Sequence, residues 1–188
     1  LRLLENGGLY LFNIFDYFDN ENDIVRSAMG EKRLILSAQI KKVFELVGFQ
    51  FAGNVVWDKG HIEGKRGFNS GNLSPFFQHP FNCWEHILIF SKGEVKSKFK
   101  NIFPTILKAQ AVVKMVKGKN VYGHTAPYPI AIPELLIKHL DADDVVLDPY
   151  AGSFTTSIVA EKYGVNSIGI EKNSEYFQLG KERLTSEI

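Results

Sequence analysis

The stretch VVLDPYAGSFTTSIVAEKY, residues 145–163, decides the fold. It begins with a short apolar run, which predicts a buried strand. Small and polar residues over 148–153 then predict a turn, and the remainder predicts a helix that ends near Gly164. Thr155 or Thr156 is expected to cap this helix, because a threonine hydroxyl accepts a hydrogen bond from a free N–H group of the first turn.

The same alternation continues to the end of the chain. Residues 167–170 predict a second strand, and residues 174–184 predict a second helix. A strand-helix-strand-helix unit is typical of a parallel α/β sheet. Glu171 ends the second strand and lies 23 residues beyond Asp148, where such folds place a carboxylate that accepts hydrogen bonds from ribose hydroxyls.

The turn indicates the class of ligand. It contains one glycine, Gly152, whereas a dinucleotide site needs the three glycines of G-x-G-x-x-G, and no phosphate-binding lysine follows. A nucleoside-bearing ligand without a pyrophosphate fits better, and S-adenosylmethionine is such a ligand. Glu171 would bind its ribose, and a carboxylate such as Asp148 would bind its ammonium group. Two alternatives stay open: an ordinary α/β turn with an incidental acid, and a nucleotide-dependent oxidoreductase, which the missing glycines disfavour.

The chain before residue 145 contains weaker sequence signals for further strands and helices. Residues 1–5 are typical of the end of an amphipathic helix that is capped by residues 6–8, and no methionine precedes them, so we expect a C-terminal portion of a longer protein. Further elements are expected from apolar periodicity: a strand at 9–15 buried on both faces of a parallel sheet, a helix at 34–47, strands at 51–57 and 87–90, and a helix from Pro133 through Leu140.

Composition sets the broad class. The chain has 188 residues and a mass of 21.2 kDa, with 45% hydrophobic and 23% charged residues, which is typical of a folded globular protein. Its single cysteine, Cys83, excludes an internal disulfide and a cysteine-based zinc cage, and the histidines lack the spacing of metal ligands. No apolar run approaches the roughly 20 residues of a membrane helix, and no leader opens the chain, so the cytoplasm is the expected compartment.

Charge is distributed unevenly along the chain. Between Lys92 and Lys119 there are eight lysines and one acid, Glu94, which gives a local charge of +7 in a chain whose net charge is +1. Such a stripe indicates a polyanion partner about as readily as a solvated surface. If the partner is DNA, its binding to this stripe weakens as the salt concentration rises.

Three blocks, in this order, resemble motifs of the amino-group DNA methyltransferases. EHILIFSK (85–92), preceded by WDKG (57–60), resembles the late strand of their catalytic half. GHTAPYPIAIP (123–133) resembles their motif X, and DPYAGSFTT (148–156) with the sequence that follows it resembles motif I. The order, with the catalytic half first and the cofactor motif last, is similar to the permuted arrangement called class β.

The resemblance implies a Rossmann-like, S-adenosylmethionine-dependent methyltransferase fold of α/β class, with a largely parallel sheet, helices on both faces and an incomplete N-terminus. It implies a site-specific DNA methyltransferase of a restriction-modification system, which methylates an exocyclic amino nitrogen of adenine or cytosine. The implied partners are double-stranded DNA and either a cognate restriction endonuclease or a second chain. The implied cofactor-binding residues are Thr125, Ala126, Pro127, Asp148, Tyr150, Gly152, Ser153 and Glu171.

The resemblance also divides the chain, which is expected to form one methyltransferase domain. Residues 1–92 would be the late part of the catalytic half, with a DNA-facing loop at 58–84. Residues 93–122 would be a lysine-rich DNA-contact segment, and residues 123–188 would bind the cofactor. The expected DNA contacts are basic residues and one aromatic wall for a flipped base: Lys59, Lys65, Arg66, Trp84, Lys96, Lys98 and Lys100.

Two departures from the family pattern matter. Phe154 stands where motif I usually has its second glycine, so its ring is expected either to enter the core or to wall the adenine. The catalytic motif, Asp/Asn/Ser-Pro-Pro followed by Tyr or Phe, is absent because no two of the seven prolines are adjacent. No catalytic residue is therefore named, and the alternative function is a non-catalytic, truncated or split partner that binds DNA or cofactor and needs another chain for the motif.

Overall fold

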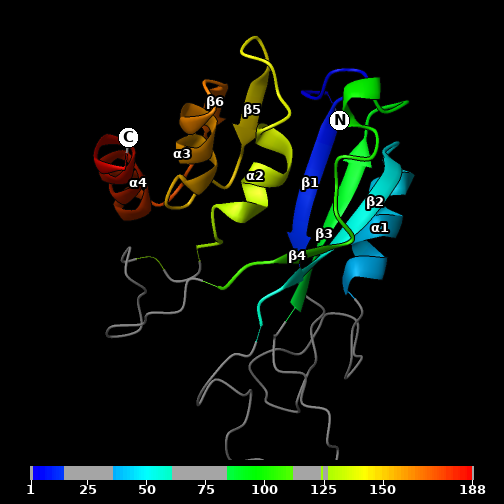
Figure 1. The fold of residues 1–188 in the computed structure, drawn as a ribbon, viewed down its shortest axis with the longest axis horizontal. Coiled ribbons are helices and arrows are strands. Elements are labelled where there is room, and N and C mark those ends of the chain that lie inside the picture. Colours follow the sequence, from blue (N-terminus) through cyan, green and yellow to red (C-terminus); the bar gives the residue numbers. More distant parts are fainter. Residues whose placement is uncertain (1, 15–35, 61–83, 112–123, 125–126, 188) are drawn as a thin grey trace, which may run out of the picture. The chain divides into compact units, whose positions relative to one another are not determined.

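The computed structural model describes residues 2–14, 36–60, 84–111, 124 and 127–187 (Figure 1). These residues form two compact units, and each is described by itself. Unit 1 comprises Leu1–Lys100 with Pro104–Lys108, and unit 2 comprises Asn101–Phe103 with Ala109–Ile188. Within the described ranges, no helix is both long and apolar enough to span a bilayer. The single methyltransferase domain expected from the sequence stays a prediction.

Unit 1 is built on a four-stranded mixed sheet with strand order β1-β3-β2-β4. The central strand β3 runs antiparallel to both of its neighbours, β1 and β2, whereas β4 runs parallel to β2. The strands are β1 (Leu9–Ile14), β2 (Gln50–Asp58), β3 (Trp84–Ser91) and β4 (Ile106–Lys108), and a short 3₁₀ helix η2 (Ser97–Phe99) lies between β3 and β4.

The first strand corrects one sequence-based prediction. The strand expected at 9–15 is confirmed over Leu9–Ile14, and residue 15 lies outside the described residues. Its neighbour is antiparallel, with Leu9 opposite Ser91, and all six residues of β1 are half-buried instead of fully buried. Aromatic packing explains its apolar sequence. Helix α1 (Leu36–Leu46) sets Phe44 against Tyr10 of β1 and Phe90 of β3, with ring centroids 5.4 and 4.4 Å apart. A strand that packs against an aromatic helix face is as apolar in sequence as one buried in a parallel sheet.

The N-terminal residues form turns, so the expected end of a helix at residues 1–5 is wrong for those the structure describes. Gly7 has a positive φ of 74°, a conformation that glycine adopts without strain. Its N–H donates to the carbonyl of Lys92 at 2.7 Å, and the Lys92 N–H donates to the carbonyl of Gly8 at 3.2 Å. These bonds extend the pairing of β1 with β3 beyond Leu9.

Unit 2 confirms the predicted strand-helix-strand-helix order, but the expectation that its first strand is buried is wrong, since exposed and half-buried residues alternate along β5. The strands β5 (Val145–Asp148) and β6 (Asn166–Gly169) pair in parallel, with Val145 opposite Asn166 and Asp148 opposite Gly169. The helices are α2 (Ala131–Ile137), α3 (Thr155–Lys162) and α4 (Ser174–Ser186), and Pro133 lies in the first turn of α2 as expected. Ile137, Val159, Ala160 and Val165 form a buried cluster between these elements.

The cap of α3 differs from the expectation, and α4 has a side-chain cap for which the sequence analysis made no prediction. No threonine caps α3: the residue before the helix is Phe154, in the left-handed conformation with φ 62° and ψ 28°, and it makes no side-chain cap. Thr155 and Thr156 are instead the first two helical residues. Helix α4 does have a side-chain cap, because Asn173 accepts hydrogen bonds from the N–H groups of Glu175 and Tyr176 at 2.9 and 3.1 Å.

Candidate functional site

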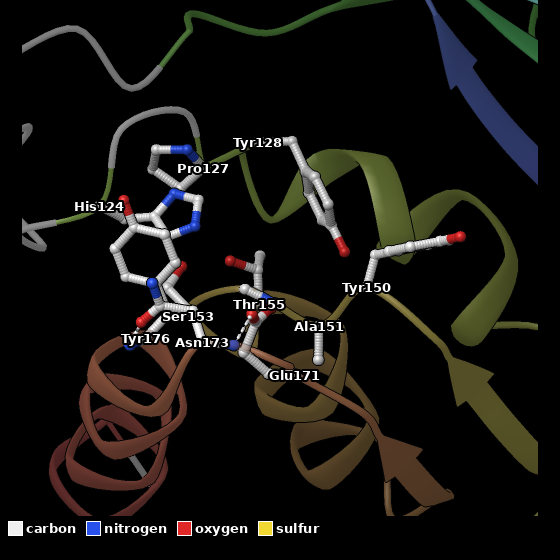
Figure 2. A pocket seen from close by; sticks show the side chains of 11 residues that line it. His124, Pro127, Tyr128, Tyr150, Ala151, Ser153, Thr155, Glu171, Asn173 and Tyr176 are labelled. Atoms are coloured by element: carbon white, nitrogen blue, oxygen red, sulfur yellow. Dashed lines mark hydrogen bonds between the residues drawn. The ribbon is translucent and has the colours of Figure 1, made fainter.

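A cavity of about 270 Å³ opens in unit 2, where the turn after β5 and the end of β6 meet the first turn of α4 (Figure 2). In open parallel sheets, ligands bind at the carboxyl ends of the strands, and this cavity has that position. The lining is mainly polar side chains and aromatic rings: His124, Pro127, Tyr128, Tyr150, Ala151, Gly152, Ser153, Thr155, Glu171, Asn173 and Tyr176.

Gly152 lines the cavity in a backbone conformation that favours glycine. Its φ is +52°, in the left-handed region, and a Cβ added there would lie 3.1 Å from Nε2 of His124. The preceding residue is fixed to the sheet, since the Ala151 N–H donates to the carbonyl of Ile170 at 2.9 Å. A residue with a side chain at 152 would therefore be strained and would also displace the imidazole.

Glu171 lies at the expected position, just beyond β6, and its carboxylate faces the turn. Oε2 accepts a hydrogen bond from the Gly152 N–H at 2.8 Å, and Oε1 accepts one from the Asn173 N–H at 2.7 Å. A carboxylate offers about four lone-pair sites, so these two bonds leave acceptor capacity on a side chain that lines the cavity. Glu171 can therefore accept hydrogen bonds from ligand hydroxyls.

Asp148 has a different role from the one expected. It does not belong to the residues that line the cavity, and three protein donors hold its carboxylate. Oδ2 accepts from the hydroxyls of Thr156 at 2.6 Å and Tyr128 at 2.9 Å, and Oδ1 accepts from the Tyr150 N–H at 3.0 Å. Asp148 therefore stabilises the turn through these hydrogen bonds. Its carboxylate is not placed to contact the ammonium group of a ligand in the cavity.

Tyr128 joins this network from the segment before α2. Its hydroxyl contacts both Asp148 and the hydroxyl of Thr156. Burial, followed by the negative charge of Asp148, raises the pKa of Tyr128 well above its ordinary value. The phenol therefore stays protonated, which keeps a hydrogen-bond donor on Asp148 and ties the segment at 127–129 to the turn.

A pair of rings forms another wall of the cavity. The centroids of His124 and Tyr176 are 4.2 Å apart, with their planes tilted by 49°, and Figure 2 shows the two rings facing each other. Burial lowers the pKa of His124, the negative charge of Glu171 partly opposes this effect, and the positive charge of Arg183 makes a smaller contribution that lowers the pKa further. The ring is therefore neutral near pH 7, and the wall it forms is suited to a planar, uncharged group.

Phe154 points away from the cavity. Its side chain is 6% exposed, and its ring packs edge-to-face against Phe177 of α4 at a centroid distance of 5.6 Å. It also covers Gly180, also on α4. Of the two positions considered for this ring, the core position is the one found, and the ring does not wall the ligand site.

The structure brings together most of the predicted cofactor residues and adds others. Pro127, Tyr150, Gly152, Ser153 and Glu171 all line the cavity, whereas Thr125 and Ala126 lie outside the described residues. Sequence reasoning missed five polar or aromatic lining residues. The 123–133 block contained two of them, and the start of the last helix supplies two more: His124, Tyr128, Thr155, Asn173 and Tyr176.

The expected DNA contact at Lys59 is not supported by the structure. Its side chain is buried (the residue is 8% exposed), it forms an ion pair with Glu85, and its ammonium group lies 4.7 Å from the ring centroid of Trp57. A charge so enclosed is held by its neighbours and is not presented to a phosphate. Trp84, by contrast, is 39% exposed and meets His86 edge-on at 5.1 Å.

The other expected DNA contacts divide between described and undescribed residues. Lys65 and Arg66 lie outside the described residues. Lys96 pairs with Glu5, Lys100 pairs with Glu94 at 3.4 Å, and Lys98 lies over the ring of Phe99 at 5.1 Å. Within the described ranges, no group of three or more His, Cys, Asp or Glu side chains is arranged to hold a metal ion.

Comparison with known proteins places this site in context. Residues 1–182 match the family model N6_N4_Mtase, described as a DNA methylase. The chain is 38% identical over 195 aligned positions to the type II beta methyltransferase M.BslI of Bacillus sp. (strain NEB-606), an alignment that covers 97% of this chain and 21% of M.BslI. The chain thus spans about a fifth of the length of that relative.

Solved structures share the fold. The PvuII DNA methyltransferase, described as cytosine-N4-specific, matches with a TM-score of 0.71 at 20% identity, over 98% of this chain and 70% of that chain. A complex of M1.HpyAVI with S-adenosylmethionine matches with a TM-score of 0.60 at 26% identity, over 97% of this chain and 76% of that chain. The expected methyltransferase fold is confirmed.

Proposed function

The chain belongs to the family of N6_N4_Mtase DNA methylases, and from this premise we propose that it carries the S-adenosylmethionine site of a DNA amino-methyltransferase. In the whole protein, this site would supply the methyl group that is transferred to an exocyclic amino nitrogen of adenine or cytosine in DNA. The observation that carries the proposal is the position of Glu171 beside Gly152 at the carboxyl end of β6.

The residues of the cavity fit this cofactor. Glu171 retains acceptor capacity for the two ribose hydroxyls, and the rings of His124 and Tyr176 offer aromatic faces against which the adenine could pack. Gly152 lines the cavity without a side chain, and the His124 ring packs against it. The described lining contains neither lysine nor arginine, which a pyrophosphate would favour, so a nucleoside-type ligand suits it better than a dinucleotide.

The chemistry explains what this chain contributes and what it needs. Bound S-adenosylmethionine supplies an electrophilic methyl group on its sulfonium sulfur. The acceptor amine is a weak nucleophile because its lone pair is delocalised into the base, so it must be oriented by hydrogen-bond acceptors and by stacking. The Pro-Pro motif that does this in the family is not in the printed sequence, in which no two prolines are adjacent. We therefore assign methyl transfer to the whole protein or to a complex with a second chain that carries the motif.

The proposed polyanion is DNA, bound in part by three lysines in and beside η2. Lys96 precedes η2, Lys98 lies within it and Lys100 follows it. The side chain of Lys100 is exposed although it pairs with Glu94. Exposed ion pairs are weak, so phosphates can replace such carboxylates as partners at little cost. We place the protein in the cytoplasm as part of a restriction-modification system, with a cognate endonuclease as a further candidate partner.

The proposed cofactor is tested by binding radiolabelled S-adenosylmethionine to the 188-residue chain in equilibrium dialysis, with unlabelled competitors. The account expects saturable binding that S-adenosylhomocysteine displaces and that NAD does not. Displacement by NAD would favour the oxidoreductase alternative. Binding of the cofactor combined with methyl transfer to DNA only after addition of a Pro-Pro-bearing chain would support the division of labour, whereas absence of binding by a folded chain would contradict the proposal.

A further inference from the structure

Arg183 of α4 is a buried cation that reaches back to the turn below the cavity. Arg183 is only 5% exposed. Its Nη1 donates to the carbonyl oxygen of Ser153 at 2.6 Å and to the Ser153 hydroxyl at 2.8 Å. The same nitrogen lies 3.2 Å from the hydroxyl of Thr155. One guanidinium group therefore holds both neighbours of Phe154.

Glu187 holds the other side of the guanidinium. Nε of Arg183 donates to Oε1 of Glu187 at 2.9 Å, and Nη2 donates to Oε2 at 3.2 Å, a two-pronged pair one helical turn further on. Bidentate pairs of this kind fix the plane of the guanidinium and compensate its buried charge. Glu187, at the end of α4, thus fixes the orientation in which the Arg183 side chain contacts the turn.

The turn needs such support because its backbone is strained. Gly152 and Phe154 both have positive φ, at 52° and 62°, with Ser153 between them. A left-handed phenylalanine persists only where its surroundings fix it. The hydrogen bonds from Arg183 act on Ser153 and Thr155, the two residues that flank this conformation, and both of them line the cavity.

We propose that Arg183 is a positioning residue for the cofactor site: by holding Ser153 and Thr155 from behind, it fixes the left-handed turn whose other face binds the ligand. The inference rests on the proposed function for the identity of the ligand, but the hold on the turn is a property of the free protein. The lowered pKa of His124, to which Arg183 contributes, agrees with a guanidinium close behind the cavity wall.

The test uses the full 188-residue chain and three variants of this pair, Arg183→Met, Arg183→Lys and Glu187→Gln. Lys181→Met, an exposed cation two positions earlier on the same helix, is the matched control. Hydrogen exchange is followed in the ligand-free proteins over residues 150–156 and over β5 and β6. The dissociation constant for S-adenosylmethionine is measured by calorimetry at a temperature well below the unfolding midpoint of each variant.

The proposal expects faster exchange confined to residues 150–156 in Arg183→Met, with β5 and β6 unchanged, and affinity that is weaker by roughly tenfold or more, the loss of about one charged hydrogen bond. Arg183→Lys should recover part of both effects, and Glu187→Gln should show a smaller loss. Unchanged exchange in the turn, or an affinity equal to that of Lys181→Met despite lowered stability, would overturn the proposal. If the wild-type chain does not bind the cofactor, the proposed function fails, while the exchange pattern still decides whether Arg183 fixes the turn.

Discussion

Gly180 of α4 lies directly against the ring of Phe154, so closely that a Cβ at position 180 would be 2.5 Å from Cγ of the phenylalanine. The two residues are complementary. Phe154 carries a large ring in the turn, and the missing side chain at position 180 of α4 provides the space for that ring. The ring consequently enters the interface between the turn and α4, and the cavity above the turn stays open.

This complementarity predicts a reversal of sign in a double-mutant cycle. In the wild-type background, Gly180→Ala should lower the free energy of unfolding by about 1–3 kcal/mol, because the added methyl group overpacks the ring. In a Phe154→Ala background, the same change should raise it by up to about 1 kcal/mol, since alanine is the better helix former. Urea unfolding measures both. Equal effects in the two backgrounds would show that the ring and the glycine do not interact.

Asn173 should stabilise α4 through its side-chain cap. Asn173→Ala removes the acceptor for the N–H groups of Glu175 and Tyr176 and should cost about 1 kcal/mol of unfolding free energy. Asn173→Asp is the matched variant, because its carboxylate keeps the acceptor and should retain most of the stability. The prediction fails if the aspartate and alanine variants unfold at the same urea concentration.

The buried hydroxyl of Tyr128 predicts a dependence of stability on pH. Its pKa is raised in the folded protein from an ordinary value of 10.0, first by burial and then by Asp148. Above that ordinary value the unfolded chain loses a proton that the folded chain retains, so this contribution to stability is complete below it and is lost as the pH rises. Urea unfolding between about pH 8 and 11 measures the effect.

Tyr128→Phe is the variant for this measurement. It should reduce the stability at neutral pH by about 1–3 kcal/mol, because Asp148 loses a buried donor, and it should also flatten the decline at high pH. Tyr150→Phe is the control, since the side chain of Tyr150 is 83% exposed. A decline in Tyr128→Phe as steep as that of the control would contradict the account.

Lys59 should act in stability and not in DNA binding. Its ion pair with Glu85 is largely buried, and removing one partner of such a pair typically costs about 3–5 kcal/mol. Lys59→Met should therefore unfold at a much lower urea concentration, whereas Lys59→Met combined with Glu85→Leu should recover a large part of the loss. The salt dependence of DNA binding by the folded single variant should match the wild type. A reduced slope against salt concentration would restore Lys59 as a phosphate contact.

Sequence patterns predicted the local elements of unit 2 because the signals are local. The apolar run of β5, the Ile168-containing segment of β6 and the glycine after α3 are local signals of strands and of a helix end. Glu171 was predictable for the same reason, since its position follows from its place at the end of a strand. The antiparallel pairing of β1 was not predictable. An apolar, aromatic strand has the same sequence pattern whether it is buried in a parallel sheet or packed against an aromatic side chain such as Phe44.

The parts of the site that sequence reasoning missed depend on contacts between distant residues. His124 meets Tyr176, and Arg183 meets Ser153, across separations along the chain at which no spacing rule applies. The left-handed conformation of Phe154 runs against the ordinary preference of a bulky residue and is permitted by Gly180. Asp148 was expected to bind the cofactor from its charge and from the motif I resemblance, and Lys59 was expected to contact DNA as a basic residue of an aromatic-rich loop. In the structure both side chains are held by protein partners, which no local pattern predicts.

The central claim, that Glu171 and the turn at Gly152 bind S-adenosylmethionine, is tested most directly by calorimetric titration of the wild-type chain and of Glu171→Gln. Glu175→Gln, an exposed acid on the first turn of α4, is the matched control. The account predicts saturable binding by the wild type and the control, and affinity weaker by roughly tenfold or more in Glu171→Gln, because the amide keeps one acceptor but loses the charge. Equal affinities of Glu171→Gln and Glu175→Gln, or no binding by a folded wild-type chain, would contradict it.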